Sequence, residues 1–417
     1  MLKKSIFLIA LISILHISTF SKDFDLAQSY AVQVGSEPSA IFYDSLNDTY
    51  NVFCIGVDKN YNTIYEPDSG DVLPSWWIVK ASEGDIFQYK PFKVADLEFA
   101  SLLPPVRPAI ALQERAVFLP LKGKIFKYNL DSHNVIDSID LNSEITYENY
   151  ALDYYDNQLL ISQSSYFGKS SIVYYSLNER KKIFEKEIGQ NIIQSVFYSD
   201  TNNEQLNIAT ISVGPFGQDS SMLYLLNAND GSVIFEKVIG NNANYIQNYQ
   251  NKFLIITLMG SHKVIIHQIA DGQEFEVLTN TTGWNGPSVA KMFNFNSINL
   301  PSEMLNWLGI ATYNSENQIG YLNNTYEFQR IENYLQIPGK IEDFAVANTP
   351  AGLFIASAQY LKEDYSPNDS VHINFIDYTS KIDEDINNQL ISFYPNPAIY
   401  KIFAPGELVP SGDVASL

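Results

Sequence analysis

A short β-hairpin pattern recurs along the chain, and this repetition limits the possible folds more than any other feature. Its clearest copy runs through 221–226, turns at Asn229-Asp230-Gly231 and returns through 232–237. The Asp-Gly pair is typical of a tight hairpin turn, because glycine readily adopts the positive φ that such turns need. Similar hairpins are expected at 76–94, 124–139, 171–189 and 263–278. Helical periodicity is almost absent, so we expect an all-β chain.

Each hairpin follows two further β-rich runs, which gives a repeating unit of four strands. We count seven such units. Their first strands are expected near Ala40, Ala109, Ala151, Ser195, Tyr245, Val289 and Glu342. Most of the spacings lie near the roughly 40 to 50 residues of one propeller blade, and the first is longer because 58–74 forms an insertion. The sequence therefore predicts a seven-bladed β-propeller over 22–377, with an array of β-sandwiches as the alternative.

The last unit contains only three of its four expected strands, near 341–347, 353–358 and 371–377. The missing strand is available at the other end of the chain, where Tyr30-Ala31-Val32-Gln33-Val34-Gly35 precedes the first unit. Pairing of this segment with 371–375 would close the ring and remove the open sheet edges at its ends. We therefore predict a propeller whose final blade takes its outer strand from the N-terminus.

The hairpin residues also resemble a known group of repeats. Residues 226–235, with the sequence LNANDGSVIF, are similar to the blade motif of YVTN and PQQ-like propellers. PQQ enzymes of this group carry a tryptophan at the docking position, and many carry an adjacent cysteine pair. Here Phe184, Phe235 and Phe275 occupy that position, and Cys54 is the only cysteine. The resemblance therefore supports the fold, and no redox cofactor is expected.

The N-terminus has the pattern of a secretory signal peptide. Lys3 and Lys4 precede an apolar run over 6–17, and small or polar residues follow up to Ser21. A run of this length is too short for a bilayer span, and no other stretch approaches the roughly 18 apolar residues that a membrane helix needs. We predict a signal peptide over 1–21, export through the periplasm, and no membrane span. A buried N-terminal helix is the alternative.

The C-terminus carries a second candidate sorting signal. An acidic linker is expected over 378–389, and the segment 390–417 contains Tyr394, Pro395, Asn396, Pro397 and Ala398. These five residues resemble the start of the type A C-terminal sorting domain of the type IX secretion system of Bacteroidetes. The resemblance implies a secreted or cell-surface protein that contacts that machinery.

The sorting domain of that family contains further strands, so 390–417 is expected to hold an incomplete copy. Either the chain is a fragment of a longer protein or its sorting signal is defective. An ordinary proline-rich turn is the alternative interpretation of the Tyr-Pro-Asn-Pro-Ala segment.

The charge of the chain argues against two classes of partner. The chain has 26 Lys and Arg residues against 47 Asp and Glu residues, which gives a net charge of -21. Sequence-independent binding to nucleic acid, or to an anionic lipid surface, needs a concentrated cationic face. We therefore expect no nucleic-acid partner. The chain is predicted to be a monomer.

Few residues suggest catalysis or metal binding. The histidines outside the signal peptide are His133, His262, His267 and His372. Their positions fit turns or strand faces better than a shared site. No sequence motif of a hydrolase, a zinc protease, a phosphate loop or a dinucleotide-binding turn is present. We therefore predict no metal site and no cofactor.

One loop offers a calcium-binding alternative. Residues 58–62 read Asp-Lys-Asn-Tyr-Asn, like the beginning of a calcium loop. However, Thr63 and Ser69 stand where such loops place a glycine and a bidentate glutamate. Asp68 and Asp71 could add oxygen ligands, so weak calcium binding stays open beside the interpretation as a solvated acidic loop.

The connections expected on one face of the propeller carry the candidate binding residues. In each blade, the link from the second to the third strand and the link to the next blade emerge on the same face. These candidates are Tyr61, Tyr65, Arg107, Tyr166, Phe167, Phe216, Trp284 and Tyr365. Aromatic side chains on polar loops suit sugar rings or protein hot spots, and the arginine suits a carboxylate. Alternatively, the aromatics fold back over the blade ends, and the prolines around Arg107 only stiffen a turn.

The leading functional hypothesis is a non-catalytic module that binds a protein or a glycan through these connections. The alternative is a secreted hydrolase or lyase with carboxylates at the mouth of the propeller channel. Asp153, Glu342 and Asp343 are candidates for that role, but they are too few to define a mechanism. We therefore assign no catalytic residue and favour binding over catalysis.

Overall fold

A computed structural model provides the structure of the chain. It describes residues 25–57, 59, 66, 70–81, 86–91, 107–121, 124–141, 149–164, 170–200, 205–214, 220–283, 285–294, 306–312, 317–323, 325–330, 340–349, 352–360 and 370–377. The predicted signal peptide, the acidic linker and the sorting segment all lie outside these residues.

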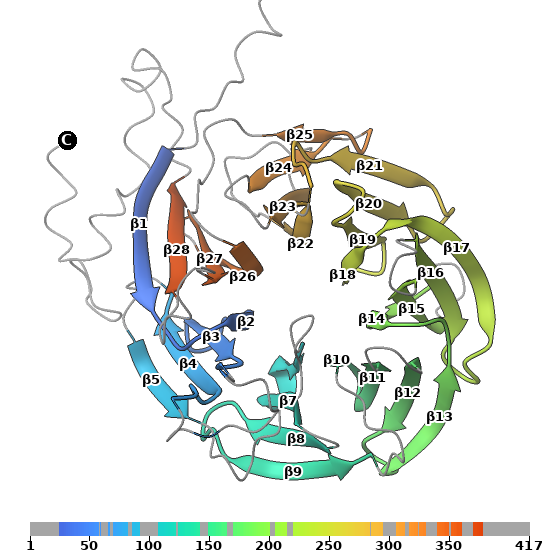
Figure 1. The fold of residues 1–417 in the computed structure, drawn as a ribbon, viewed down its shortest axis with the longest axis horizontal. Helices are drawn as coiled ribbons and strands as arrows, with labels where there is room; N and C mark the ends of the chain where they lie inside the picture. The colour runs from blue at the N-terminus through green and yellow to red at the C-terminus, as the bar shows by residue number, and fades with distance from the viewer. Residues whose placement is uncertain are drawn as a thin grey trace, which may run out of the picture.

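Within the described ranges, strands β1–β28 form seven four-stranded antiparallel sheets around a central axis (Figure 1). The only helix in these ranges is the short 3-10 turn η3 (Leu112–Glu114). The predicted all-β, seven-bladed propeller is confirmed. We number the blades 1 to 7 in chain order. In blades 1 to 6, the first strand lies nearest the axis and the fourth forms the rim.

The first three blades occupy the N-terminal part of the ring. Blade 1 contains β2 (Pro38–Asp44), β3 (Thr49–Cys54), β4 (Ser75–Lys80) and β5 (Ile86–Pro91). Blade 2 contains β6 (Ala109–Ala111), β7 (Ala116–Leu121), β8 (Lys124–Asn129) and β9 (Val135–Asp140). Blade 3 contains β10 (Asn149–Tyr155), β11 (Gln158–Ser164), β12 (Ser170–Ser176) and β13 (Lys181–Glu187).

The remaining blades repeat the same order. Blade 4 contains β14 (Ile192–Ser199), β15 (Leu206–Val213), β16 (Ser220–Asn227) and β17 (Val233–Asn241). Blade 5 contains β18 (Ala243–Tyr249), β19 (Phe253–Leu258), β20 (Lys263–Gln268) and β21 (Glu274–Leu278). Blade 6 contains β22 (Pro287–Asn294), β23 (Asn306–Thr312), β24 (Gln318–Leu322) and β25 (Phe328–Arg330).

Blade 7 joins the two ends of the chain. It contains β26 (Lys340–Thr349), β27 (Gly352–Tyr360), β28 (Ser370–Asp377) and, on its outside, β1 (Asp25–Gln33). β1 pairs antiparallel with β28, with Tyr30 opposite Ile373 and Val32 opposite Val371. The predicted closure by an N-terminal outer strand is therefore confirmed, and the ring is held together by backbone hydrogen bonds between segments far apart in sequence.

The predicted hairpin turns that lie within the described ranges form where the sequence places them. Between β16 and β17, Gly231 has a φ of 69°, which glycine adopts without strain. A Cβ atom at this position would come within 2.9 Å of the Phe184 ring of the neighbouring blade. Gly231 is therefore required both by the turn and by the close approach of blade 3.

The core lies between the blades. The buried apolar residues of the described ranges form seven clusters, each of which joins adjacent sheets, and the cluster between blades 6 and 7 also includes Tyr245 of blade 5. At the interface of blades 1 and 2, Trp76 is 1% exposed and its ring meets Tyr128 and His133 edge-on. Second strands such as β19 are buried along their whole length because a neighbouring sheet covers each face. This packing fixes the inner strands around the axis.

Candidate functional site

Most of the candidate binding residues predicted from the sequence lie outside the described part of the chain. These residues are Tyr61, Tyr65, Tyr166, Phe167, Phe216, Trp284 and Tyr365. The strand ends that border several of these connections are described. Because neighbouring strands of each blade run antiparallel, these strand ends lie at the face of the propeller where the inner strands begin. The structure therefore supports the expected grouping of the connections, while a binding role for their aromatics stays a prediction.

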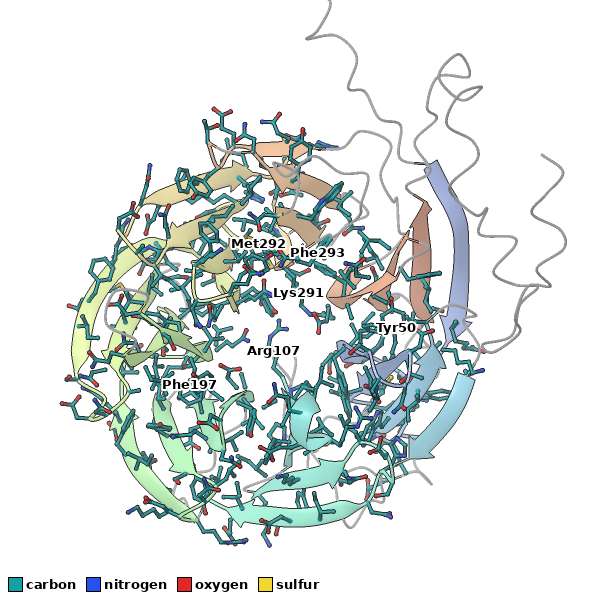
Figure 2. The ribbon with its side chains drawn as sticks, turned by 180° about the vertical axis from the view of Figure 1, so that it is seen from behind. Tyr50, Arg107, Phe197, Lys291, Met292 and Phe293 are labelled. Atoms are coloured by element: carbon teal, nitrogen blue, oxygen red, sulfur yellow. The ribbon has the colours of Figure 1, made fainter. Side chains whose placement is uncertain are left out.

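Arg107 is the one predicted binding residue that the structure describes, and it lies at the channel. It precedes β6 by two residues and forms a parallel bridge with Ala151 of blade 3, where its carbonyl accepts the Leu152 N–H at 2.9 Å. This anchored backbone directs the side chain towards the centre of the ring (Figure 2). Arg107 is only 5% exposed, and its guanidinium lies 4.5 Å from the ring centroid of Tyr245.

Tyr245 connects the charged groups of the channel. It is the third residue of β18 and is 8% exposed. Lys291 Nζ lies 5.8 Å from the same ring centroid that Arg107 approaches. Burial raises the pKa of Tyr245, and the charges of Lys291, Asp343, Arg107 and Asp153 also act on it. The phenol therefore stays protonated near neutral pH, and its ring forms a cation–π contact with each cation.

Lys291 and Asp343 form a buried ion pair between blades 6 and 7. Their side chains are 19% and 7% exposed, with 2.7 Å between Nζ and Oδ1. Nζ also donates to the Phe344 carbonyl at 2.6 Å. Burial alone would lower the pKa of Lys291, but the charge and hydrogen bond of Asp343 raise it overall. Lys291 is therefore charged, and Asp343 neutralises it locally.

Asp153 occupies a different electrostatic environment, although it also lies on an inner strand. Its Oδ2 accepts the Phe197 N–H of blade 4 at 2.7 Å. Burial raises the pKa of Asp153 to about 7, and this hydrogen bond only partly opposes the shift. A carboxyl group with such a pKa can hold or release a proton near neutral pH, which is the property of a general acid or base.

The channel carboxylates also belong to a repeated contact between neighbouring blades. Asp343 Oδ2 accepts the Ile41 N–H of blade 1 at 3.1 Å, as Asp153 accepts that of Phe197. Gln247 Oε1 accepts the Met292 N–H at 2.8 Å, and Gln194 Oε1 accepts the Ile246 N–H at 3.3 Å. In each case, a side chain on one inner strand satisfies a backbone donor of the next inner strand. We call these four contacts the inner-strand clamps.

The inner-strand clamps change the interpretation of the carboxylates that the sequence singled out. Asp153 and Asp343 lie at the channel, as expected, but each one is engaged by a neighbouring blade. Glu342 lies beside Asp343 on β26. The structure thus places all three on inner strands of blades 3 and 7 without showing a reaction for any of them.

Sequence reasoning missed Lys291 and Gln247 as channel residues, and it used Tyr245 only to mark the start of a unit. Each lies on an inner strand that is otherwise mostly buried and apolar. The sequence did contain a signal for these channel residues, because Gln247 and Lys291 are polar residues at matching positions of the inner strands of successive blades. The clamp partners are separated by 44, 45 or 52 residues, close to one blade length, except where the clamp closes the ring.

The acidic insertion of blade 1 is described only in part. Asp58, Asn60, Asn62, Thr63, Asp68 and Ser69 lie outside the described residues. Asp71 is 7% exposed, and its two carboxylate oxygens accept the Lys59 and Glu66 N–H groups at 3.0 and 2.8 Å. Asp71 therefore ties the loop to itself, and calcium binding by the other residues stays a prediction. Within the described ranges, no group of three or more His, Cys, Asp or Glu residues could hold a metal ion.

The described histidines occupy turn and strand positions. His133 is 7% exposed and packs on Trp76, and His262 lies in a turn with a φ of 53°. His267 lies on β20, where Nδ1 is 3.2 Å from Glu274. Cys54 is 2% exposed in the core between blades 7 and 1. These placements match the turn and strand-face positions expected for the histidines and the buried position expected for the cysteine.

Comparison with known proteins finds similarity in structure alone. No protein-family model matches the chain, and no curated protein matches it in sequence. The RRP9 WD40 repeats have a TM-score of 0.57 and 9% identity, over 85% of this chain and 98% of that one. BBS1N in complex with ARL6DN has a TM-score of 0.52 and 10% identity, over 86% and 98% of the two chains. The Dos1 propeller has a TM-score of 0.52 and 7% identity, over 82% and 94%.

At such low identities these similarities show the propeller fold and nothing finer. The fold is common, with 1225 similar chains among solved structures, so it does not indicate a particular activity. Separately, none of the helical residues that the structure describes forms a segment long and apolar enough to cross a bilayer.

Proposed function

We propose that the chain is a non-catalytic binding propeller that recognises a protein or a glycan through the connections at the face where the inner strands begin. The observation that carries this proposal is that channel carboxylates bind groups of neighbouring blades. Asp153 and Asp343 each accept a backbone N–H of the next blade, and Asp343 also neutralises Lys291. Two of the three candidate carboxylates are thus engaged in holding the ring together, which leaves the connections as the more adaptable surface.

The frame behind these connections suits rigid presentation of side chains. In the described ranges, seven clusters of buried apolar residues join neighbouring blades, and β1 closes the ring. A loop whose ends are held by such a frame loses less conformational entropy on binding. The similar propeller BBS1N was solved in complex with ARL6DN, so a frame of this kind is compatible with a protein partner.

The experiment compares loop variants with a matched rim variant. Trp284→Ala and Tyr166→Ala in the full chain should abolish capture on an array of glycans and bacterial surface proteins. Phe235→Ala is the control, because Phe235 is an aromatic side chain, 39% exposed, on the outer strand β17. It should leave capture unchanged. Capture by the loop variants at the level of the unmodified chain would contradict the proposal.

A hydrolase or lyase is the second candidate, and the protonation of Asp153 favours it. Its pKa of about 7 lies where a general acid or base works best. Asp153→Asn keeps the side-chain oxygen that accepts the Phe197 N–H but cannot exchange a proton. If a hydrolase or lyase activity is found, this variant should abolish turnover while the fold is retained. Unchanged turnover would remove Asp153 from consideration.

We propose further that the protein is exported through the periplasm to the cell surface or the medium, and that its blades belong to the YVTN type. The basic and apolar N-terminus and the segment Tyr394 to Ala398 support the export route. The test is expression in a Bacteroidetes host with and without a working type IX secretion system. The protein should reach the surface or medium only in the first host, and equal export from both would contradict this route.

A further inference from the structure

Arg107 has a buried donor whose partner is missing among the described residues. Its Nη2 atom is fully buried, and no acceptor lies within hydrogen-bond distance in the part of the chain that the structure describes. Buried polar groups in proteins are hydrogen-bonded in the large majority of cases, and a buried charge without a counter-charge is costly. The cation–π contact with Tyr245 offsets part of that cost but accepts no hydrogen bond.

Lys291, Asp343 and Asp153 already have partners in the channel. Asp343 neutralises Lys291 at 2.7 Å and also accepts the Ile41 N–H. Asp153 accepts the Phe197 N–H and carries little charge below neutral pH, because burial raises its pKa to about 7. Among the cations that contact Tyr245, Lys291 therefore has a carboxylate partner at 2.7 Å, whereas no ion pair is formed by Arg107 within the described residues. The chemical group that completes such a site carries a single negative charge and presents hydrogen-bond acceptors.

We propose that the channel of this propeller contains a carboxylate-binding site in which Arg107 binds the ligand's two oxygens and Lys291 lies across the Tyr245 ring as a second cation. A planar carboxylate matches the forked donors of a guanidinium, which can bind both oxygens at once. A phosphate dianion fits less well, because a single uncompensated charge faces it and Asp343 lies close by. The ligand is a small free carboxylate or an acidic side chain of a bound protein.

This site shares Arg107 with the predicted binding surface, but its other residues, Tyr245 and Lys291, lie on inner strands and not on the connections. Arg107 is held by its backbone contacts with blade 3, and Tyr245 lies on an inner strand of blade 5. The contacts that place both residues are made by other described residues. A variant that combines Trp284→Ala with Tyr166→Ala should therefore bind acetate like the unmodified chain, so failure of the loop proposal and failure of this one are distinguishable.

The test is calorimetric titration of the full chain with acetate, against sodium chloride at equal ionic strength. We expect saturable binding of acetate and none of chloride. Arg107→Gln should weaken acetate binding by about tenfold or more, since a hydrogen bond to a charged group is lost. Arg180→Gln is the matched control, because Arg180 is an exposed arginine paired with Asp137 on the rim, and it should not change the affinity.

Further measurements make the result decisive. If Arg107→Gln does not fold, Arg107→Lys keeps the charge but loses the fork, and acetate should still bind more weakly than to the unmodified chain. If a short peptide with an internal glutamate displaces acetate, the carboxylate ligand is an acidic side chain of a bound protein. If acetate binds and the peptide does not displace it, the ligand is a small free carboxylate. No saturable binding, equal affinity in the Arg107 variants, or tighter binding of inorganic phosphate than of acetate would each overturn the proposal.

Discussion

The inner strands around the axis and the outer strands at the rim both present one unpaired sheet edge, and they protect it in different ways (Figure 1). At the axis, the inner-strand clamps supply acceptors from the preceding blade to backbone N–H groups. At the rim, β17 lies largely in solvent and carries Glu236 and Lys237, and the half-exposed β13 carries five charged side chains among its seven residues. Such charges discourage pairing with a second chain.

This difference shows where the fold depends on individual side chains. A backbone group at the axis that loses its acceptor stays buried, whereas a group at the rim can bond to water. Apolar side chains are tolerated at the rim as well, since Ile234 is 56% and Val238 is 58% exposed. We therefore expect the effect of replacing a polar or charged residue on the free energy of unfolding to decrease with distance from the axis, and variants at four positions test this expectation.

The largest effect is expected for Asp343→Ala. This change removes the counter-charge of Lys291 and the acceptor of the Ile41 N–H in one step. Breaking a buried ion pair by removal of one partner costs about 3 kcal/mol or more, because the other charge stays in the interior. The free energy of unfolding, measured by urea denaturation, should fall by about that amount.

Asp343→Asn is the matched control for this loss. The amide oxygen can still accept the Ile41 N–H, but the side chain no longer neutralises Lys291. The difference between the two variants therefore separates the clamp from the ion pair. A loss below about 1 kcal/mol for Asp343→Ala, typical of an exposed pair, would contradict the special role of the axis.

The second variant is expected to raise the free energy of unfolding, and the size of this gain depends on pH. Burial raises the pKa of Asp153 from 3.8 to about 7 in the folded chain. Below about pH 4 both states hold the proton. Between about pH 4 and 7 the unfolded chain loses it first, so the free energy of unfolding falls as the pH rises. Linkage gives a loss of ~4 kcal/mol for the full shift, and we expect about half because Asp153 is partly open to the channel.

Asp153→Asn should abolish this part of the pH dependence. The amide is neutral at every pH and its oxygen still accepts the Phe197 N–H. Urea denaturation at pH 8 should show the variant to be about 2 kcal/mol more stable than the unmodified chain, and at pH 4 the two should be nearly equal. If Asp153→Asn is less stable than the unmodified chain at pH 8, the ionised carboxylate of Asp153 stabilises the folded chain. That outcome would contradict the expected rise of its pKa.

The sequence contained enough information to predict the fold. Turn residues such as Asp230 and Gly231 fix the hairpins locally, and the same pattern returns at blade length. The absent fourth strand of the last unit identified Tyr30 to Val34 as its replacement, and β1 pairs with β28 as expected. These features follow from local propensity and from edge pairing, both of which can be identified in one sequence.

The channel was harder to predict, because its contacts join different blades. Arg107 and Asp343 were named separately, but no local pattern indicates that Arg107 lies over Tyr245 or that Lys291 pairs with Asp343. These contacts depend on the angle between neighbouring sheets and on the height of each residue along the propeller axis. Comparison of the seven inner strands would have shown the polar positions, but not which of them meet.

The third effect tests an ion pair at the end of the inner strand β2, where Asp44 meets the turn that follows β6. Arg115 follows η3 and its guanidinium binds both oxygens of Asp44, with 2.7 and 2.8 Å between the atoms. Burial alone would raise the pKa of Asp44, but hydrogen bonds from Arg115 and from the Leu46 N–H lower it overall. Arg115→Ala should cost about 1 to 2 kcal/mol at pH 7, because Asp44 keeps only 3% of its surface exposed.

The pH dependence of the Arg115→Ala loss provides its control. A lowered pKa in the folded chain contributes stability that is present above the unfolded pKa and is lost as the pH falls through the folded pKa. The difference between Arg115→Ala and the unmodified chain should therefore shrink towards pH 3 in urea denaturation. A difference that stays constant with pH would indicate lost packing rather than the ion pair.

The smallest effect is expected at the rim, where Arg180 of blade 3 pairs with Asp137 of blade 2. The two side chains are 64% and 42% exposed, with 3.0 Å between Nη1 and Oδ2. The hydrogen bond from Arg180 lowers the pKa of Asp137, but water can replace that partner at once. Asp137→Ala should therefore change the free energy of unfolding by less than about 1 kcal/mol, and added salt should reduce even this change. This pair joins neighbouring blades as Lys291 and Asp343 do, so a loss as large as that of Asp343→Ala would mean that contact between blades matters more than distance from the axis.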